Sequence, residues 1–362
     1  MRFVFSDEQE ALKREARRFL DQHATPATVR SAMESERGWA PDLWKRIGEL
    51  GWPSLAVPEA YGGVELGFVE LVAIFEETGR ALLCAPFFST VCLGTAALTL
   101  GGSEAQKATW LPELASGAVT ATLAHASSQV AARTDGASVI LRGTVDTVID
   151  GHTADLLLIP ARESAGLGVY LVPKDAAGLQ RRVRATLDPT RKLAAITLDG
   201  VQVPASARLP GDGALLLART LERAKIALAA EQVGGAQRCL ELSVDYAQTR
   251  VQFGRPIGSF QAIKHKCADQ LVLVESARSA LYWAGFCAAT DDPELPIAAS
   301  LARSYCSEAF FRVAGETIQI HGGIGFTWEH DAHLYFRRAR SSMALFDAPA
   351  VEREAIARSL GL

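Results

Sequence analysis

The chain has 362 residues, of which 49% are hydrophobic and 22% charged, a balance typical of a globular protein with a continuous core and one that excludes a disordered chain. Lysine and arginine number 37 against 41 aspartates and glutamates, which leaves a formal net charge of −4. Because no long basic run is present, we expect no nucleic-acid partner.

A helix is predicted to begin at Ser6, because SDEQ places an N-cap serine three residues before Gln9, the arrangement of a capping box. Hydrophobic residues then recur on one stripe: Ala11, Leu12, Ala16, Phe19 and Leu20. The segment has no hydrophobic core of signal-peptide length, so we expect a cytoplasmic protein. Further helices are predicted near 41–50 and 66–83, and between them GWPSLAVPEAYGGVE indicates an ordered loop.

The uncharged stretch from Ala81 to Gly102 has the length of a bilayer span. Pro86, Gly94 and several hydroxyl side chains interrupt it, so we predict a loop followed by a buried helix and expect no membrane partner. The six cysteines form no CxxC pair and have no histidine at zinc-binding spacing. Since most have hydrophobic neighbours, we expect buried, reduced thiols and no metal.

The character of the sequence changes near residue 118. Short hydrophobic or alternating runs such as DLLLIPA, GVYLVP and LAAITLDGVQV continue to Leu209 and indicate a β-rich domain. Long helical periodicity returns after Gly213. We therefore predict an α+β protein with an N-terminal α-helical domain (1–117), a middle β domain (118–212) and a C-terminal α-helical domain (213–362).

Two segments of the C-terminal half carry the most specific pattern. YAQTRVQFGRPIGSFQAIKHKCAD follows the first long helix, and QIHGGIGFTWEHDAHLYFRRAR begins at Gln319. In type and order they resemble two diagnostic segments of the acyl-CoA dehydrogenase family, and GWPSLAVPEAYGG and TLDPTRKLAAITLDGVQVPASA are weaker matches. The resemblance covers nearly the whole chain. It implies a helical domain, a β-barrel-like domain and a C-terminal four-helix bundle that carries the oligomer interface.

The resemblance also implies FAD as the cofactor, an acyl-CoA thioester as the substrate, and an assembly of two or four subunits. In the family, one group of matching positions contacts the FAD that belongs mainly to the neighbouring subunit: Arg250, Phe253, Gln261, Gln319, Gly322 and Gly323. The residue types suit this role. A guanidinium fork matches a diphosphate, a phenyl ring offers a flat hydrophobic face, and glycines let a backbone approach a ligand closely.

The middle domain departs from the family pattern. Members that hold their own FAD carry a threonine-glutamate-proline segment followed by glycine, serine and aspartate, and later a tryptophan-isoleucine-threonine segment. Here the corresponding regions read TATLAHASSQVAARTDG and LRGTVDTVIDGHTADLLLIP, and neither signature is present. His125 lies near the place of the acidic residue, and we expect a structural histidine there.

The catalytic base is missing from both of its family positions. The reaction removes an α-proton while a hydride leaves the β-carbon for the flavin, so a carboxylate must lie against the substrate. The resemblance places Phe346 at one position, with Asp347 beside it, and Ala224 at the other. Asp347 is a candidate base only if a one-residue shift brings it inward. Glu222 and Lys225 match positions that contact the CoA moiety or order its site; otherwise they are solvated helix charges.

These features favour a non-catalytic subunit of a heteromeric α2β2 acyl-CoA dehydrogenase, a type associated with steroid and other bulky acyl-CoA substrates. A paralogous subunit then supplies the base, and an electron-transfer flavoprotein accepts the electrons. Two alternatives stay open. One is a self-sufficient homomeric dehydrogenase with Asp347 as its base, and the other is a scaffold or regulatory paralogue without chemistry.

Overall fold

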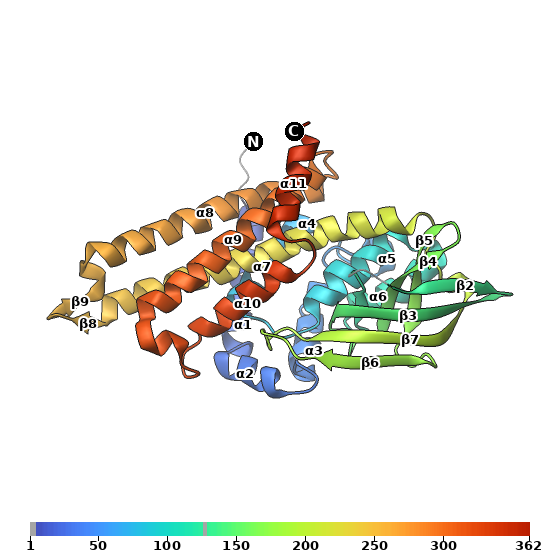
Figure 1. The fold of residues 1–362 in the computed structure, drawn as a ribbon, viewed down its shortest axis with the longest axis horizontal. Helices are drawn as coiled ribbons and strands as arrows, with labels where there is room; N and C mark the ends of the chain where they lie inside the picture. Colours follow the sequence, from blue (N-terminus) through green and yellow to red (C-terminus); the bar gives the residue numbers. More distant parts are fainter. Residues whose placement is uncertain (1–4, 126–128) are drawn as a thin grey trace. The chain divides into compact units, whose positions relative to one another are not determined.

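A computed structural model describes residues 5–125 and 129–362 (Figure 1). Its internal contacts divide the chain into two compact units. Met1–Val29, Phe68–Leu83 and Lys225–Leu362 form one, here called the helical unit, and Arg30–Gly67 with Cys84–Ala224 form the other, called the sheet unit. Along the sequence the predicted order of helices, then strands, then helices is confirmed.

The helical unit is built from long helices that run beside one another (Figure 1). They are α1 (Asp7–His23), α4 (Phe68–Arg80), α7 (Gly213–Thr249), which enters from the sheet unit, α8 (Gln261–Ala289), α9 (Leu295–His321), α10 (Ala332–Ala344) and α11 (Pro349–Ser359). The predicted capping box at the start of α1 is confirmed, because the Ser6 hydroxyl accepts from the Gln9 N–H and the Gln9 side chain accepts from the Ser6 N–H. The first helix therefore begins where the sequence indicates.

Glycines allow α4 and α7 to touch backbone to backbone. A Cβ on Gly79 would lie 2.0 Å from the carbonyl oxygen of Glu231, and one on Gly234 would lie 1.7 Å from that of Glu76. No side chain fits into either gap, so these two positions require glycine. The close approach helps to bury the two consecutive glutamates of α4.

Glu76 and Glu77 are each only 2% exposed and are neutralised by basic residues of neighbouring helices. Lys13 lies 2.7 Å from Glu76, which also pairs with Arg278 of α8. Arg17 donates two hydrogen bonds of 2.8 Å to the Glu77 carboxylate. Buried carboxylates persist only with such partners, so these contacts fix how α1, α4 and α8 pack.

The sheet unit contains a mixed, seven-stranded sheet. Its strands are β1 (Ala121–Leu123), β2 (Ala131–Asp135), β3 (Ser138–Ile149), β4 (Leu156–Glu163), β5 (Gly166–Pro173), β6 (Leu179–Arg184) and β7 (Leu193–Pro204). Their order is β1-β4-β2-β3-β7-β6, with β5 also paired to β4. β1 and β2 run parallel to β4, and register shifts interrupt the long antiparallel pair β3–β7, which bends these strands.

Shorter helices complete the sheet unit: most of α2 (Pro26–Glu34), then α3 (Pro41–Glu49), α5 (Ala96–Gly101) and α6 (Glu104–Ala115). The predicted buried helix near Gly94 is confirmed, although Ser89–Thr95 winds as a π-helical turn before α5 begins. No helix of the described residues is both long and hydrophobic enough to cross a bilayer. All six cysteines are free thiols, five of them buried, and Cys267 is half-buried.

Candidate functional site

A two-residue hairpin presents Phe253 to the surrounding solvent. β8 (Val251–Gln252) and β9 (Arg255–Pro256) pair antiparallel, and the two residues between them have left-handed φ angles, 54° at Phe253 and 78° at Gly254. Positive φ at both central residues defines a type I′ turn, which asparagine and glycine favour and a bulky aromatic residue does not. The phenyl ring is nevertheless 92% exposed. A strained and exposed aromatic residue indicates a contact surface.

The end of α9 provides a second exposed segment. Gly322 has φ 64° and ψ −140°, a conformation open almost only to glycine. A Cβ built on Gly322 or on Gly323 meets no atom within 4 Å, so packing inside this chain does not explain the glycine at 323. Gln319, one turn earlier, is also exposed. A backbone left open in this way allows a ligand to approach closely.

Contacts between helices bring these two segments to the same end of the helical unit (Figure 1). Lys266, near the start of α8, pairs with Glu316, near the end of α9. Tyr246, near the end of α7, stacks on His321 at a ring distance of 4.4 Å. All six predicted cofactor residues are therefore exposed at this end of the helical unit, which we call the hairpin end: Arg250, Phe253, Gln261, Gln319, Gly322 and Gly323.

Sequence reasoning missed two histidines, His321 and His330, that pack beside the glycine loop. His321 is buried, its Nδ1 lies 2.7 Å from the carbonyl oxygen of Thr317, and its ring is 4.4 Å from that of His330. Burial lowers the pKa of His321, so the neutral ring is favoured. Both histidines lie in the segment QIHGGIGFTWEHDAHLYFRRAR, but nothing in their spacing predicted that their rings meet.

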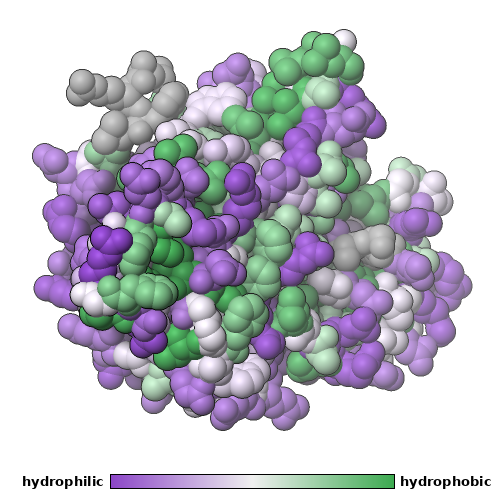
Figure 2. Space-filling view, turned by 60° about the vertical axis from the view of Figure 1, so that its left-hand side comes forward, coloured by the Kyte–Doolittle hydropathy of each residue, from purple (hydrophilic) through white to green (hydrophobic). Residues whose placement is uncertain are grey.

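Exposed hydrophobic residues surround the hairpin end. Val251, Ile324, Phe326 and Trp328 are all exposed, and the Arg337 guanidinium lies 4.9 Å from the centre of the Trp328 ring. Figure 2, which brings the left-hand side of Figure 1 forward, shows hydrophobic patches among the hydrophilic residues. Clustered exposed hydrophobic residues next to arginine are typical of a protein interface.

The two family positions for a catalytic base hold no available carboxylate. Ala224 is fully buried in α7. Phe346 is half-buried with a left-handed φ of 57°, and Asp347 beside it is 53% exposed. The Asp347 carboxylate lies 3.0 Å from Lys225 Nζ, which also lies 2.8 Å from the buried carboxylate of Glu352. Burial lowers the pKa of Lys225, but the Glu352 and Asp347 carboxylates outweigh it and the pKa is raised, so the ion pair is maintained.

A fully buried arginine holds the loop that carries Phe346 and Asp347. Arg303 of α9 donates hydrogen bonds to the carbonyl oxygens of Ser342, Met343 and Leu345 at 3.0, 3.2 and 2.6 Å. These carbonyls lie at the end of α10, where the last acceptors of a helix lack helical donors; that of Ser342 also accepts from the Leu345 N–H. Burial lowers the pKa of Arg303 to about 10, which leaves it protonated at neutral pH. Nothing in the sequence around Arg303 predicted this role.

Two other predicted positions lie in the sheet unit. Glu222 is half-buried on α7, three residues before Lys225. His125 is half-buried at the end of the segment that follows β1. Most of the residues that correspond to the lost flavin-ring signature are described, but 126–128 lie outside the described residues. The functions predicted for Glu222 and His125 stay predictions.

The sequence matches the family model for the acyl-CoA dehydrogenase C-terminal domain over residues 211–361 and that for the N-terminal domain over residues 6–118. It is 37% identical to the acyl-CoA dehydrogenase IpdE2 of Mycolicibacterium smegmatis, covering 95% of this chain and 96% of the relative. Identity to the acyl-CoA dehydrogenase FadE27 of Mycobacterium tuberculosis is 31%, covering 89% of each chain.

Solved structures of the same fold include heteromeric complexes. A chain of the ChsE4-ChsE5 complex from Mycobacterium tuberculosis superposes with a TM-score of 0.94 at 29% identity, covering 100% of this chain and 99% of that one. A chain from a variant of the Tcur3481-Tcur3483 steroid ACAD superposes with a TM-score of 0.89 at 30% identity, covering 98% of both.

Proposed function

Because the chain belongs to the acyl-CoA dehydrogenase family, whose cofactor is FAD, we propose that it is the subunit of a heteromeric enzyme that completes a paralogous partner's FAD site. The partner supplies the catalytic base. The observation that carries this proposal is an asymmetry: the hairpin end is kept and exposed, while Ala224 and Phe346 occupy both base positions and Asp347 pairs with Lys225.

The hairpin end fits an FAD molecule presented by another chain. The Arg250 guanidinium suits the diphosphate, and the exposed Phe253 ring offers a face for the adenine. The open backbone at Gly322 and Gly323 leaves room for the cofactor to approach closely. When bound, FAD would supply the hydride acceptor of the reaction, and Arg250, Phe253 and the open backbone at Gly322 and Gly323 would bind and orient it and exclude water from one side.

The substrate class follows from the relatives. Two of the structural neighbours belong to two-component complexes, one of them described as a steroid ACAD. This supports a bulky acyl-CoA thioester as the substrate and a paralogous subunit as the partner. We propose an electron-transfer flavoprotein as the acceptor of the electrons, in line with the family.

The test compares the chain alone with the chain co-expressed with its nearest genomic paralogue, using visible absorbance and light-scattering mass. We expect colourless protein alone and a yellow mixed complex. In that complex, Arg250→Ala should lower FAD content, whereas Arg358→Ala, at an exposed arginine of α11 away from the hairpin end, should not.

A second substitution separates the alternatives. Asp347→Asn should leave the turnover of the mixed complex unchanged, because the partner carries the base. Yellow homomeric protein whose acyl-CoA oxidation is abolished by Asp347→Asn would instead establish a self-sufficient dehydrogenase. If the chain stays colourless with every paralogue, the remaining hypothesis is a scaffold or regulatory protein without chemistry.

A further inference from the structure

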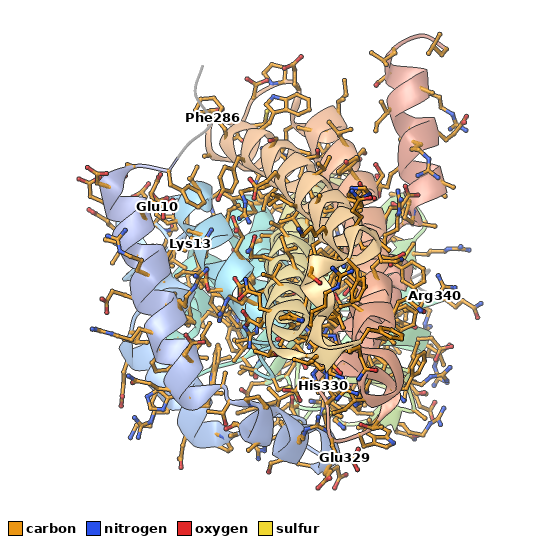
Figure 3. The ribbon with its side chains drawn as sticks, turned by 90° about the vertical axis from the view of Figure 1, so that its left-hand side faces the viewer. Glu10, Lys13, Phe286, Glu329, His330 and Arg340 are labelled. Carbon is orange, nitrogen blue, oxygen red and sulfur yellow. The ribbon has the colours of Figure 1, made fainter. Side chains whose placement is uncertain are left out.

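A pocket of about 340 Å³ lies within the helical unit at the end of α8 that is far from the hairpin end. We call it the α8-end pocket. Its lining comes from the start of α1, from α4 and from the last turns of α8: Phe5, Ser6, Gln9, Val69, Val72, Tyr282, Gly285, Phe286, Ala289 and Thr290. In Figure 3, Phe286 lies in the upper part of the view, above Glu10 and Lys13 of α1, and Glu329 and His330 lie at the bottom.

Gly285 of α8 lets Val72 of α4 approach the helix closely at the edge of the pocket. Gly285 is buried within the helix, where glycine is destabilising relative to alanine. Even a single Cβ there would lie 3.1 Å from Val72 Cγ2, so a side chain at this position would push the two helices apart. The Phe5 and Tyr282 rings, 4.4 Å apart, form one wall. Together with Val69 and Phe286 these side chains give the pocket a mainly hydrophobic lining.

The polar groups around the pocket already have partners within the chain. The Gln9 amide donates to Glu70 at 2.9 Å and accepts from the Ser6 N–H, also at 2.9 Å. Ser6 Oγ donates to Glu8, and Thr290 Oγ1 donates to the carbonyl oxygen of Phe286. Because none of these groups needs a ligand, the hydrophobic surface of Val69, Val72 and the aromatic rings determines what fits.

The elements that line the pocket carry several carboxylates beside the lining residues. Three are in the first turn of α1, one in the first turn of α4 and three in the segment after α8: Asp7, Glu8, Glu10, Glu70, Asp291, Asp292 and Glu294. The nearest basic residues of the same elements, Lys13 and Arg278, are both paired with buried Glu76. The C-terminal end of α8 adds its own negative dipole. The rim is therefore strongly negative.

The negative charge around the pocket limits which molecules can bind there. Acyl-CoA thioesters, flavin phosphates, nucleic acids and anionic membranes all carry negative charge, so this rim repels them. A hydrophobic group surrounded by positive charge is complementary to both the pocket and its rim. Protein interfaces commonly use this arrangement, in which one hydrophobic side chain fills a pocket and charges around it guide the approach.

We propose that the α8-end pocket is a docking site for a partner protein that inserts a leucine or phenylalanine side chain from a segment rich in lysine and arginine. The hydrophobic side chain fills the pocket that Val69, Val72 and Phe286 line. The basic residues of the partner face the carboxylates of α1 and of the segment after α8. This site is separate from the flavin surface and does not depend on which subunit holds the base.

The test uses immobilised synthetic peptides and surface plasmon resonance with the complete chain. One peptide carries a leucine and a phenylalanine flanked on each side by lysine and arginine. A second replaces the basic residues by glutamate, and a third replaces the two hydrophobic residues by serine. We expect only the first to bind, and its Kd to rise about tenfold or more between about 0.05 M and about 0.5 M NaCl, because salt screens the rim.

Two substitutions locate the binding. Ala289→Phe, at an exposed alanine of the pocket wall, should fill the pocket and weaken binding about tenfold or more. Ala350→Phe, at an exposed alanine of α11, is the matched control and should change nothing. The proposal is overturned if the first peptide does not bind, if the glutamate peptide binds equally well, or if Ala289→Phe and Ala350→Phe give the same affinity.

Discussion

Replacing Arg303 by methionine is expected to lower the free energy of unfolding by about 1.5–3 kcal/mol. The guanidinium is fully buried and donates to three backbone carbonyls at the end of α10. Losing a charged donor costs about 1.5–3 kcal/mol for each acceptor left without a partner. Two are left, the carbonyls of Met343 and Leu345, because that of Ser342 still accepts from the Leu345 N–H. The buried methionine side chain returns about 1.5–3 kcal/mol through its hydrophobic surface. The backbone carbonyls remain in place when the side chain is changed, so they lose their donor and the protein becomes less stable.

Urea denaturation followed by circular dichroism, at fixed protein concentration, measures this difference through the transition midpoint. Arg312→Met is the matched control, because Arg312 is an exposed arginine on the same helix, and it should change stability by less than about 0.5 kcal/mol. If Arg303→Met costs no more than this control, the bonds from Arg303 do not hold the end of α10. Other contacts would then position the segment that precedes Asp347.

Three further predictions follow from single contacts. Phe253→Asn should stabilise the isolated chain by about 1 kcal/mol, since asparagine tolerates the left-handed turn, yet lower FAD retention in the mixed complex; thermal melts and absorbance test the two effects. Glu76→Gln should destabilise the chain by about 3–5 kcal/mol, because Lys13 and Arg278 lose their shared carboxylate, whereas Glu15→Gln at an exposed site should be neutral in the same melts. The pKa of His321 is lowered on folding, so the unfolded chain binds more protons and stability should fall as pH drops below about 6.5; in urea titrations at several pH values, His321→Gln should flatten this dependence.

Local signals in the sequence predicted the parts of the fold that depend on neighbouring residues. The SDEQ pattern placed the start of α1 correctly, because a capping box is completed within four residues. The alternating runs after residue 118 predicted the strands, because each strand buries one or both faces. Contacts between distant segments were not predictable in this way. FEETGR reads as the charged face of a helix, and only the packing of α1 and α8 makes Glu76 and Glu77 buried.

In the candidate site, too, contacts between distant segments could not be predicted from local sequence signals. The family resemblance brought together residues of two segments about sixty positions apart, which periodicity alone could not do. It also named Asp347 and Lys225 separately, but not their ion pair, since that depends on where the end of α10 and α11 pack against α7. The α8-end pocket was invisible in the sequence, because Gly285 looks like any glycine in a helix until Val72 and Phe5 are placed beside it.

The two ends of α8 have opposite electrostatic character. Its N-terminal end lies next to Arg250 and Arg255 and carries Lys264 and Lys266, and its backbone dipole there is positive. Its C-terminal end is followed by Asp291, Asp292 and Glu294, and the dipole there is negative. At 29 residues and about 1.5 Å per residue, the helix separates the two ends by about 43 Å, several times the Debye length of about 8 Å.

At such a separation, a phosphate-bearing cofactor and a basic protein segment neither compete for the same charges nor screen one another. One helix can thus hold an anionic cofactor at one end and a cationic partner at the other. We therefore expect the basic peptide to bind equally well to the isolated chain and to the FAD-loaded complex. Affinities that differ about tenfold between the two would mean that the ends of α8 are coupled through the bundle rather than independent.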